Sequence, residues 1–448
     1  MVQKVLILGS GFVAKPVVDI LAARPDTEVT VACRTLESAK ALAGDASNTR
    51  AVSLDVSDTA ALDAAVAACD LVISLIPYTF HVDVIKSAIK TKKTNVLTTS
   101  YLSPAIRALD KEIKDAGIIV WNEIGVDPGI DHLYAVKAID EIHKAGGEVT
   151  EFTSFCGGLP APEASDNPLG YKFSWSPRGV LLALRNDATY YKDGELVRVA
   201  GKDLMKSAKP YFIYPGFSFY GYGNRDSTIF RELYKIPEAK SVLRGSLRYP
   251  GFTEFVSALV ALGFLDETPK DFLTTAIPWK EAFAQIIGAP SSSEEDLLAT
   301  IDSKVTFDTA EEKEKVVSGF RWLGFFSETP ITPRGNPLDT ICALFEKLME
   351  YAPEERDMVV LQHKFGITWK DGSKGIRTST LVDYGDPNGY SSMAKLVGTP
   401  CALAATFMLD GKYTEPGIYA PYSPELCDPY REVLKDKYGI FLIEKTVL

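Results

Sequence analysis

The stretch KVLILGSGFVAKPVVDILAAR (residues 4–24) decides the fold of the first part of the chain. A short apolar run is followed by a Gly-x-Gly-x-x-Ala turn and then by apolar residues at helical spacing. In such a turn Gly9 closes a tight bend, Gly11 lets backbone approach a diphosphate, and Ala14 lets the helix pack closely on the strand. Within a strand–helix–strand unit this pattern predicts a dinucleotide site. The alternative is a glycine turn that binds no ligand.

The alternation of strand and helix continues through the first third of the chain. We expect further strands at EVTVACR (28–34), AVSLDV (51–56), DLVISLIP (70–77), NVLTTSY (95–101) and IIVW (118–121). These runs are apolar on both faces, as in strands buried between two layers of helices. The pattern predicts an α/β domain with a doubly wound parallel sheet of the Rossmann type.

After residue 131 the pattern changes to hairpin-linked strands, which predict a second, α+β domain with a mixed sheet. Helical spacing dominates from 253 to 351, where we expect an all-α insertion. The tail from about residue 390 returns to helix, and its pattern fits either domain.

Composition limits the classes of function. The 448 residues carry a formal net charge of −11, which argues against nucleic acid or an anionic membrane as a partner. Six scattered cysteines lack a Cys-x-x-Cys pair and four histidines lack metal-ligand spacing, so we expect reduced thiols and no metal. The longest apolar run, Cys401–Leu409, falls short of the ~18 residues of a membrane span and is expected to belong to the core. The first residues show no targeting pattern. A cytoplasmic protein is therefore expected.

The end of the second expected strand indicates which nicotinamide coenzyme is bound. NAD-binding domains place an Asp or Glu there to accept a hydrogen bond from the ribose 2′-hydroxyl. This chain has Cys33, Arg34 and Thr35 instead, and a guanidinium can bind a 2′-phosphate through two hydrogen bonds. The residues favour NADP(H); the alternative is a solvated surface arginine.

Hydroxyl groups gather at two other strand ends. Thr98, Ser100 and Tyr101 end the fifth expected strand, and residues 74–77 end the fourth. Because ligands of open α/β sheets bind outside the carboxyl ends of the strands, these residues are predicted to line a crevice. An ordinary polar strand terminus is the alternative.

The segment NEIGVDPGIDHLY (122–134) follows the sixth expected strand with a turn that carries two carboxylates. Asp131 is expected to be the N-cap of the helix that follows. Asp127 lies outside that helix and is expected to face the crevice, where it could act as a general acid–base group.

Arginines in the middle of the chain suit an acidic substrate. Arg225, Arg244 and Arg248 lie in segments rich in glycine and aromatic residues. A guanidinium recognises a planar carboxylate, although any one arginine is more often a surface residue.

Several motifs together carry a resemblance to a known family. They are GSGFVAKP, DLVISLIPYTFH, NEIGVDPGIDHLYA, SFCGGLPAPEASDNPLGYKFSWSPRGVLLALRN, NRDST and LRGSLRY, which begin at residues 9, 70, 122, 154, 224 and 243. In this order, over essentially the whole chain, they resemble the saccharopine reductases, the fungal NADP-dependent, glutamate-forming saccharopine dehydrogenases.

The resemblance implies an architecture and an assembly. It implies a Rossmann domain at 1–130 that is completed by 390–448, an α+β substrate and dimerisation domain at 131–252 and 352–389, and an inserted helical domain at 253–351. It also implies a homodimer.

The resemblance further implies a reaction of lysine biosynthesis. The amine of L-glutamate condenses with L-2-aminoadipate 6-semialdehyde to an imine, which NADPH reduces to saccharopine in a reversible reaction. Both reactants carry carboxylates, which need cationic groups in the site.

The motifs and the resemblance together assign the site residues. NADP(H) is expected to be held by Gly9, Ser10, Gly11, Phe12, Val13, Cys33, Arg34, Thr35, Leu54, Asp55, Leu75, Ile76, Pro77, Thr98 and Val126. The substrate is expected to be held by Ser100, Tyr101, Asp127, Phe173, Arg225, Arg244 and Gly245. The catalytic candidates are Asp127, Tyr101 and Cys156.

Two alternatives stay open. The first is a related NADP-dependent reductase of another imine or semialdehyde, which a requirement for both substrates would exclude. The second is a non-catalytic NADPH-sensing module, which tight coenzyme binding without turnover would favour. The polar loops of the middle domain speak against a sensor, because a sensor needs no second polar site.

Overall fold

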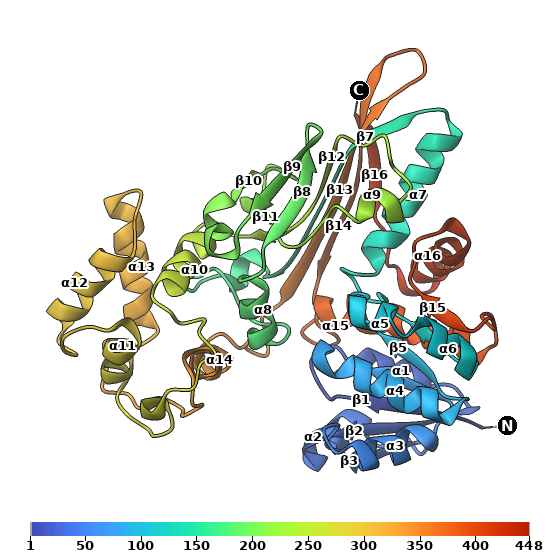
Figure 1. Cartoon of the computed structure of the whole chain (residues 1–448), viewed down its shortest axis with the longest axis horizontal. Helices are drawn as coiled ribbons and strands as arrows, with labels where there is room; N and C mark the ends of the chain where they lie inside the picture. Colours follow the sequence, from blue (N-terminus) through green and yellow to red (C-terminus); the bar gives the residue numbers. More distant parts are fainter. Residues whose placement is uncertain (1, 448) are drawn as a thin grey trace. The chain divides into compact units, whose positions relative to one another are not determined.

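The chain forms two compact units, shown in the computed structural model of Figure 1, which describes residues 2–447. The first unit comprises Met1–Gly147 and Asn388–Glu444. The second comprises Glu148–Pro387 and Lys445–Leu448. The C-terminal segment therefore contributes to both.

A seven-stranded parallel sheet forms the centre of the first unit. Its strand order is β15-β6-β5-β4-β1-β2-β3, and every neighbouring pair is parallel. The strands are β1 (Gln3–Leu8), β2 (Thr27–Cys33), β3 (Thr49–Ser53), β4 (Leu71–Ser74), β5 (Asn95–Thr98), β6 (Ile119–Trp121) and β15 (Gly417–Tyr419). The prediction of a doubly wound, Rossmann-type sheet is confirmed.

Helices cover this sheet because the strands bury both of their faces. The helices are α1 (Lys15–Ala22), α2 (Leu36–Ala43), α3 (Thr59–Ala67), α4 (His81–Thr91), α5 (Pro104–Arg107), α6 (Asp110–Ala116), α7 (Ile130–Lys144), α15 (Ser392–Leu409) and α16 (Pro424–Tyr438). Leu62 of α3, Ile85 of α4 and Ile113 of α6 pack with Leu6 and Val96 of the strands in one core. Helix α1 packs against α15, and α7 packs against α16.

Helix α15 is a long, apolar helix of the first unit. Its 18 residues are long and apolar enough to cross a membrane by length and composition alone, but 78% of them are buried within the structure. The expectation that Cys401–Leu409 belongs to the core is therefore confirmed.

A mixed sheet forms the centre of the second unit. Its order is β10-β11-β12-β7-β13-β14-β16, and the β8–β9 hairpin attaches to β12. Strands β7 and β12 run parallel, whereas β11 with β12 and β13 with β7 and β14 are antiparallel. The strands are β7 (Glu148–Pro160), β8 (Ala188–Lys192), β9 (Glu195–Val199), β10 (Lys209–Tyr211), β11 (Phe219–Gly223), β12 (Ser241–Arg248), β13 (Asp357–Thr368), β14 (Lys374–Tyr384) and β16 (Ile443–Val447). The predicted α+β class is confirmed.

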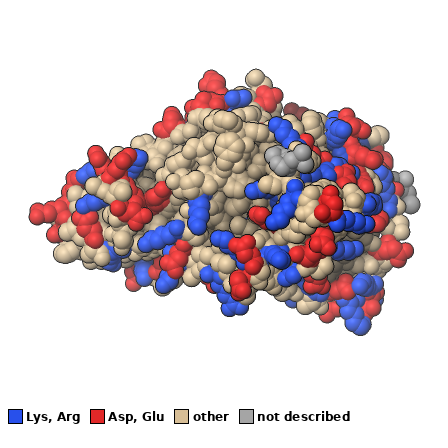
Figure 2. Space-filling view, turned by 90° about the horizontal axis from the view of Figure 1, so that it is seen from above, with Lys and Arg blue, Asp and Glu red and all other residues tan. Residues whose placement is uncertain are grey.

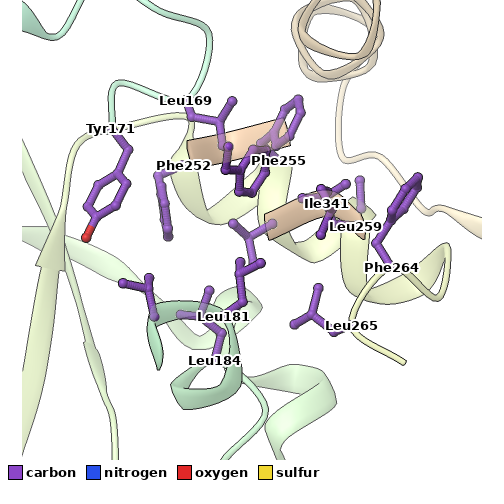
Figure 3. Packing of buried hydrophobic residues seen from close by; sticks show 14 of the residues in the cluster. Leu169, Tyr171, Leu181, Leu184, Phe252, Phe255, Leu259, Phe264, Leu265 and Ile341 are labelled. Carbon is purple, nitrogen blue, oxygen red and sulfur yellow. The ribbon is translucent and has the colours of Figure 1, made fainter. Parts of the chain in front are cut away.

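The expected helical insertion shares its core with this sheet. Its helices are α10 (Phe252–Ala261), α11 (Trp279–Ile287), α12 (Glu294–Lys304), α13 (Ala310–Trp322) and α14 (Pro337–Leu348); α8 (Pro177–Ala183) and α9 (Phe230–Leu233) precede them. Leu259 of α10 packs beside Ile341 of α14 and near Leu181 of α8, as Figure 3 shows. The same cluster includes Phe155 of β7 and Leu247 of β12.

Two boundaries differ from the expected ones. The first unit ends at Gly147 rather than at residue 130, because α7 buries its apolar face against α16. The last strand, β16, joins the sheet of the second unit, although residues 390–448 were all expected in the Rossmann domain.

Candidate active site

The turn between β1 and α1 leaves room for a ligand. Gly9 has φ +104, and a Cβ there would lie 2.7 Å from the carbonyl oxygen of Leu75, so only glycine fits. A Cβ at Gly11 would meet no heavy atom within 4 Å. The buried Ala14 donates its N–H to the Gly11 carbonyl oxygen at 3.1 Å and is the N-cap residue of α1. The turn therefore opens a space at the N-terminus of a helix, the place where proteins bind diphosphates.

The predicted coenzyme residues lie at one edge of the first sheet. Strands β1 to β5 are parallel neighbours, so their carboxyl ends meet at the same edge. The residues that follow these ends are Ser10, Phe12 and Val13 after β1, Arg34 and Thr35 after Cys33 at the end of β2, Leu54 and Asp55 after β3, Leu75, Ile76 and Pro77 after β4, and Thr98 at the end of β5. Val126 follows β6 and is buried. The structure brings this set together on one edge.

Arg34 is available to bind an anion. It is exposed, and within residues 2–447 its guanidinium forms no ion pair. Hydrogen bonds from Ser57 lower the pKa of Asp55, and the charge of Arg34 adds a smaller effect of the same sign. The guanidinium of Arg34 and the open space at Gly11 together fit the phosphate groups of NADP(H).

Asp127 and Tyr101 are hydrogen-bonded to each other. The Tyr101 hydroxyl donates to Asp127 Oδ1, and both side chains are half-buried. The peptide bond between Asp127 and Pro128 is cis. Two of the three predicted catalytic residues thus form a pair in the first unit.

Buried polar groups fix the turn that carries Asp127. Glu123 Oε1 accepts the N–H of Leu102 at 2.8 Å, and Oε2 bonds His132 Nε2 at 2.8 Å and the Tyr422 hydroxyl at 2.6 Å. Burial opposes the charge of Glu123, but the hydrogen bonds with His132, Tyr422 and Leu102 outweigh it and lower its pKa. The carboxylate therefore stays ionised inside the protein.

Asp131 has a different role from the expected one. The N-cap residue of α7 is Gly129, and Asp131 lies inside the first turn of the helix. The side chain folds back, and Oδ1 accepts the N–H of Gly129 at 2.5 Å. The predicted N-cap position is thus wrong, although the carboxylate does bond a terminal N–H of this helix.

Sequence reasoning missed His81, which begins α4 and contacts the ends of β4 and β5. Its Nδ1 lies 2.9 Å from Ser74 Oγ, and its Nε2 lies 2.8 Å from Ser100 Oγ and 3.0 Å from Thr98 Oγ1. Burial lowers the pKa of His81 to about 4. The only sequence signal was its place at the start of the helix after β4.

The second unit carries its own polar group around Cys156. Ser246 of β12 lies in register with Cys156 of β7 on one side and with Tyr222 of β11 on the other. Arg248, two residues further along β12, is only 6% exposed. Burial opposes its charge, but the phenols of Tyr222 and Tyr171 and the thiol of Cys156 outweigh burial and raise its pKa.

Arg248 forms no ion pair among the described residues. One Nη donates to the carbonyl oxygen of Leu247 at 2.7 Å, and its Nε has no hydrogen-bond partner. The guanidinium lies 5.1 Å from the ring centres of Tyr171 and Phe252. A buried charge held mainly by aromatic rings is unusual, so Arg248 is a stronger candidate for binding an anion than the sequence indicated.

The other predicted substrate residues have mixed surroundings. Arg244 is 1% exposed, and its guanidinium lies 4.3 Å from the Phe230 ring centre. Phe173 is buried in the core of the second unit. A Cβ at Gly245 would lie 2.1 Å from the Tyr222 carbonyl oxygen, so this position requires glycine for packing alone. Arg225 follows β11. The substrate roles of these four residues stay predictions.

The part of the chain that the structure describes contains no candidate metal site. Within residues 2–447, no group of three or more His, Cys, Asp or Glu side chains could hold a metal ion. The six cysteines, which all lie within the described residues, form no disulfide.

Comparisons with known proteins cover the whole chain. Residues 5–120 match the saccharopine dehydrogenase NADP binding domain, and residues 125–440 match the saccharopine dehydrogenase C-terminal domain. The chain is 63% identical to saccharopine dehydrogenase (NADP(+), L-glutamate-forming) of Saccharomyces cerevisiae and 55% identical to that of Schizosaccharomyces pombe, with 99% of each chain covered. The solved structure of the apo Saccharomyces cerevisiae enzyme matches with a TM-score of 0.89 at 62% identity over 100% of both chains. Alpha-aminoadipic semialdehyde synthase of Bos taurus is 39% identical, and the match covers 99% of this chain but 48% of that protein.

Proposed function

The chain belongs to the saccharopine dehydrogenase family, and we propose that it joins L-glutamate and L-2-aminoadipate 6-semialdehyde into saccharopine in the penultimate step of fungal lysine biosynthesis. It is an NADP-dependent oxidoreductase. The observation that carries the proposal is the full-length identity of 63% to an enzyme named for this reaction. The reaction is reversible, so saccharopine and NADP⁺ are substrates for the opposite direction.

The coenzyme supplies a hydride when it is bound. In the proposal, the N-terminus of α1 and the open space at Gly11 hold its diphosphate. Arg34 binds the 2′-phosphate, because its exposed guanidinium has no ion-pair partner among residues 2–447. Arg34 therefore determines the choice between NADP(H) and NAD(H), because both coenzymes carry the diphosphate.

Asp127 moves the proton in the proposed reaction. Formation and collapse of the carbinolamine need a group that takes a proton from the amine and returns one to the departing hydroxyl. The Tyr101 hydroxyl donates to Asp127 Oδ1 and so fixes the direction of that carboxylate. Asp127 is the acid–base residue in this proposal, and Tyr101 orients it.

Arg248 recognises a substrate carboxylate in the second unit. A buried guanidinium is stable when an opposite charge satisfies it, and the described residues offer it none. A carboxylate of the amino-acid substrate meets this need through two parallel hydrogen bonds. Arg248→Gln should raise the KM for saccharopine and leave NADPH affinity unchanged. A KM equal to that of the wild type would contradict this role.

The assembly is proposed to be a cytoplasmic homodimer, as the family resemblance implies. Large apolar side chains of the second unit are exposed, among them Leu196, Phe212 and Ile229. Figure 2 shows a broad area with few charged side chains on the face that it displays. Sedimentation equilibrium should give twice the mass of one chain, whereas a monomeric mass at micromolar concentration would refute the proposal.

The reaction itself is tested by the substrates that NADPH oxidation requires. We expect oxidation only when L-glutamate and the semialdehyde are both present, and far slower oxidation of NADH. Oxidation with the semialdehyde alone would indicate a simple aldehyde reductase. Tight NADPH binding without any turnover would indicate the non-catalytic sensing module instead.

A further inference from the structure

His81 connects three hydroxyl groups at the carboxyl edge of the first sheet. Its ring is 2% exposed at the start of α4, with Ser74 Oγ at Nδ1 and both Ser100 Oγ and Thr98 Oγ1 at Nε2. Ser74 and Thr98 are 1% and 0% exposed, whereas Ser100 is half-buried. The ring therefore links two enclosed hydroxyls to one that can reach a ligand.

The imidazole is neutral, which limits what it can bond. Burial lowers its pKa to about 4, and the positive end of the α4 dipole also disfavours a charged ring. A neutral imidazole has one N–H and one lone pair. Three hydroxyl hydrogens face that single lone pair, so at least two of them are not bonded to the ring. The Ser100 hydrogen is the one that can point outward, because Ser74 and Thr98 are enclosed.

The backbone of Ser100 is fixed on both sides. Its N–H donates to Thr98 Oγ1 at 3.1 Å, and its carbonyl oxygen accepts the N–H of Glu123 at 3.1 Å. Only the direction of the hydroxyl group remains to be set. The shortest bond of the ring is the 2.8 Å contact between His81 Nε2 and Ser100 Oγ. Ser74 Oγ has no other side-chain hydrogen bond among the described residues, so its hydroxyl is free to donate to the lone pair of an unprotonated Nδ1.

We propose that His81 is a positioning residue: its Nε2–H holds Ser100 Oγ as an acceptor and so directs the Ser100 hydroxyl hydrogen toward a carboxylate of the amino-acid substrate. A hydroxyl that donates to a carboxylate forms a strong, charge-assisted hydrogen bond. The inference rests on the proposed function, in which Ser100 binds substrate. It adds a residue that touches neither substrate nor coenzyme but fixes the polarity of one that does.

Two substitutions of His81 separate this role from a general effect on packing. A glutamine amide nitrogen can occupy the position of Nε2, whereas an asparagine amide reaches only the position of Nδ1. In NADP⁺-dependent saccharopine oxidation, His81→Asn should raise the KM for saccharopine about tenfold, with a smaller change in kcat and an unchanged Kd for NADP⁺. His81→Gln should have a KM for saccharopine close to that of the wild type.

A double-mutant cycle shows whether His81 acts through Ser100. In a Ser100→Ala background, His81→Asn should add no further loss in kcat/KM, because the hydroxyl that it directs is gone. Fully additive losses would overturn the proposal. Ser87→Ala is the matched control, since Ser87 is buried on the same helix and donates to Asp63 at 2.6 Å, away from the ring. This control should leave the KM unchanged.

The tautomer of the ring is tested without any turnover. NMR of histidine ring nitrogens should show a protonated Nε2 and an unprotonated Nδ1 for the resonance that disappears in His81→Gln. The opposite tautomer would overturn the proposal. If the wild type does not oxidise saccharopine, the proposed function fails, and the ring spectrum still decides the hydrogen-bond arrangement around His81.

Discussion

Asp127 is the residue on which the proposed chemistry depends most. Its carboxylate is half-buried and accepts the Tyr101 hydroxyl. Asp127→Ala should lower kcat by a factor on the order of 10²–10⁴, which is the usual contribution of a positioned acid–base group. NADPH affinity, measured by fluorescence titration, should change less than about twofold, because the substitution removes an interaction that acts in the transition state and not in coenzyme binding. A kcat equal to that of the wild type would exclude the role given to Asp127.

Arg34 determines the coenzyme in this account. Arg34→Asp should weaken NADPH binding and improve NADH binding, because a carboxylate repels the 2′-phosphate and accepts from a 2′-hydroxyl. The ratio of kcat/KM values for NADPH and NADH should fall by at least tenfold. Arg50→Asp is a matched charge change on the neighbouring strand, where Arg50 bonds Thr30 Oγ1 at 2.8 Å. An unaltered ratio for Arg34→Asp would refute the assignment.

His81 should make the protein less stable in mild acid. Its folded-state pKa of about 4 lies below the unfolded value of about 6.5, so the unfolded chain binds the proton first. The stability that the neutral ring contributes is complete above about pH 6.5 and is lost as the pH falls toward 4.

The His81→Gln variant isolates this effect. Between pH 7 and pH 5 the wild type should lose about 2 kcal/mol more unfolding free energy than the variant, an order-of-magnitude figure from the linkage relation. Urea unfolding at both pH values measures the difference. Equal losses in the two proteins would show that the ring is not held neutral.

At the scale of elements, the turn between β1 and α1 contains two glycines with different roles: Gly9 is required by the fold, and Gly11 is proposed to leave space for the coenzyme. Gly9→Ala adds a Cβ 2.7 Å from a backbone oxygen at φ +104, so it should lower the unfolding free energy by about 2 kcal/mol. Gly11→Ala adds its Cβ to open space and should leave the Tm unchanged. It should weaken NADPH binding tenfold or more, because the methyl group occupies the space proposed for the diphosphate. Unchanged NADPH affinity in Gly11→Ala would place the coenzyme elsewhere.

The elements show which parts of the site a sequence can reveal. The strand ends that carry Gly9, Arg34 and Thr98 could be predicted, because apolar runs and glycines mark where parallel strands stop. The row of Cys156, Ser246 and Tyr222 could not, because the register between β7, β11 and β12 depends on contacts between distant segments. Register is set by packing over a whole face, and no local pattern records it.

His81 and Arg248 illustrate the same limit for single side chains. His81 has no distinguishing pattern in the sequence, and Arg248 is there only one of three arginines suited to an acidic substrate. Their significance comes from burial and from partners that lie far along the chain or on neighbouring strands. The last strand, β16, shows a related limit, since its short apolar segment fits either sheet in the sequence and pairs with β14 in the folded chain.

For the whole molecule, the fold class followed from the order of the patterns along the chain. Alternating strands and helices predicted the parallel sheet, and hairpins predicted the mixed sheet. The extent of each unit did not follow, because α7 is separated from its partner α16 by nearly the whole second unit in the sequence. The fold alone also leaves the substrate open, and the family membership supplies it.

The central claim, that this chain joins two amino acids by reducing an imine, is tested most directly by the product. Mass spectrometry can follow a reaction of nitrogen-labelled L-glutamate, the semialdehyde and deuterated NADPH. We predict a product of the mass of saccharopine that retains the glutamate nitrogen and gains one deuterium at the new carbon–nitrogen bond. A reduced alcohol of the semialdehyde without the labelled nitrogen would contradict the claim.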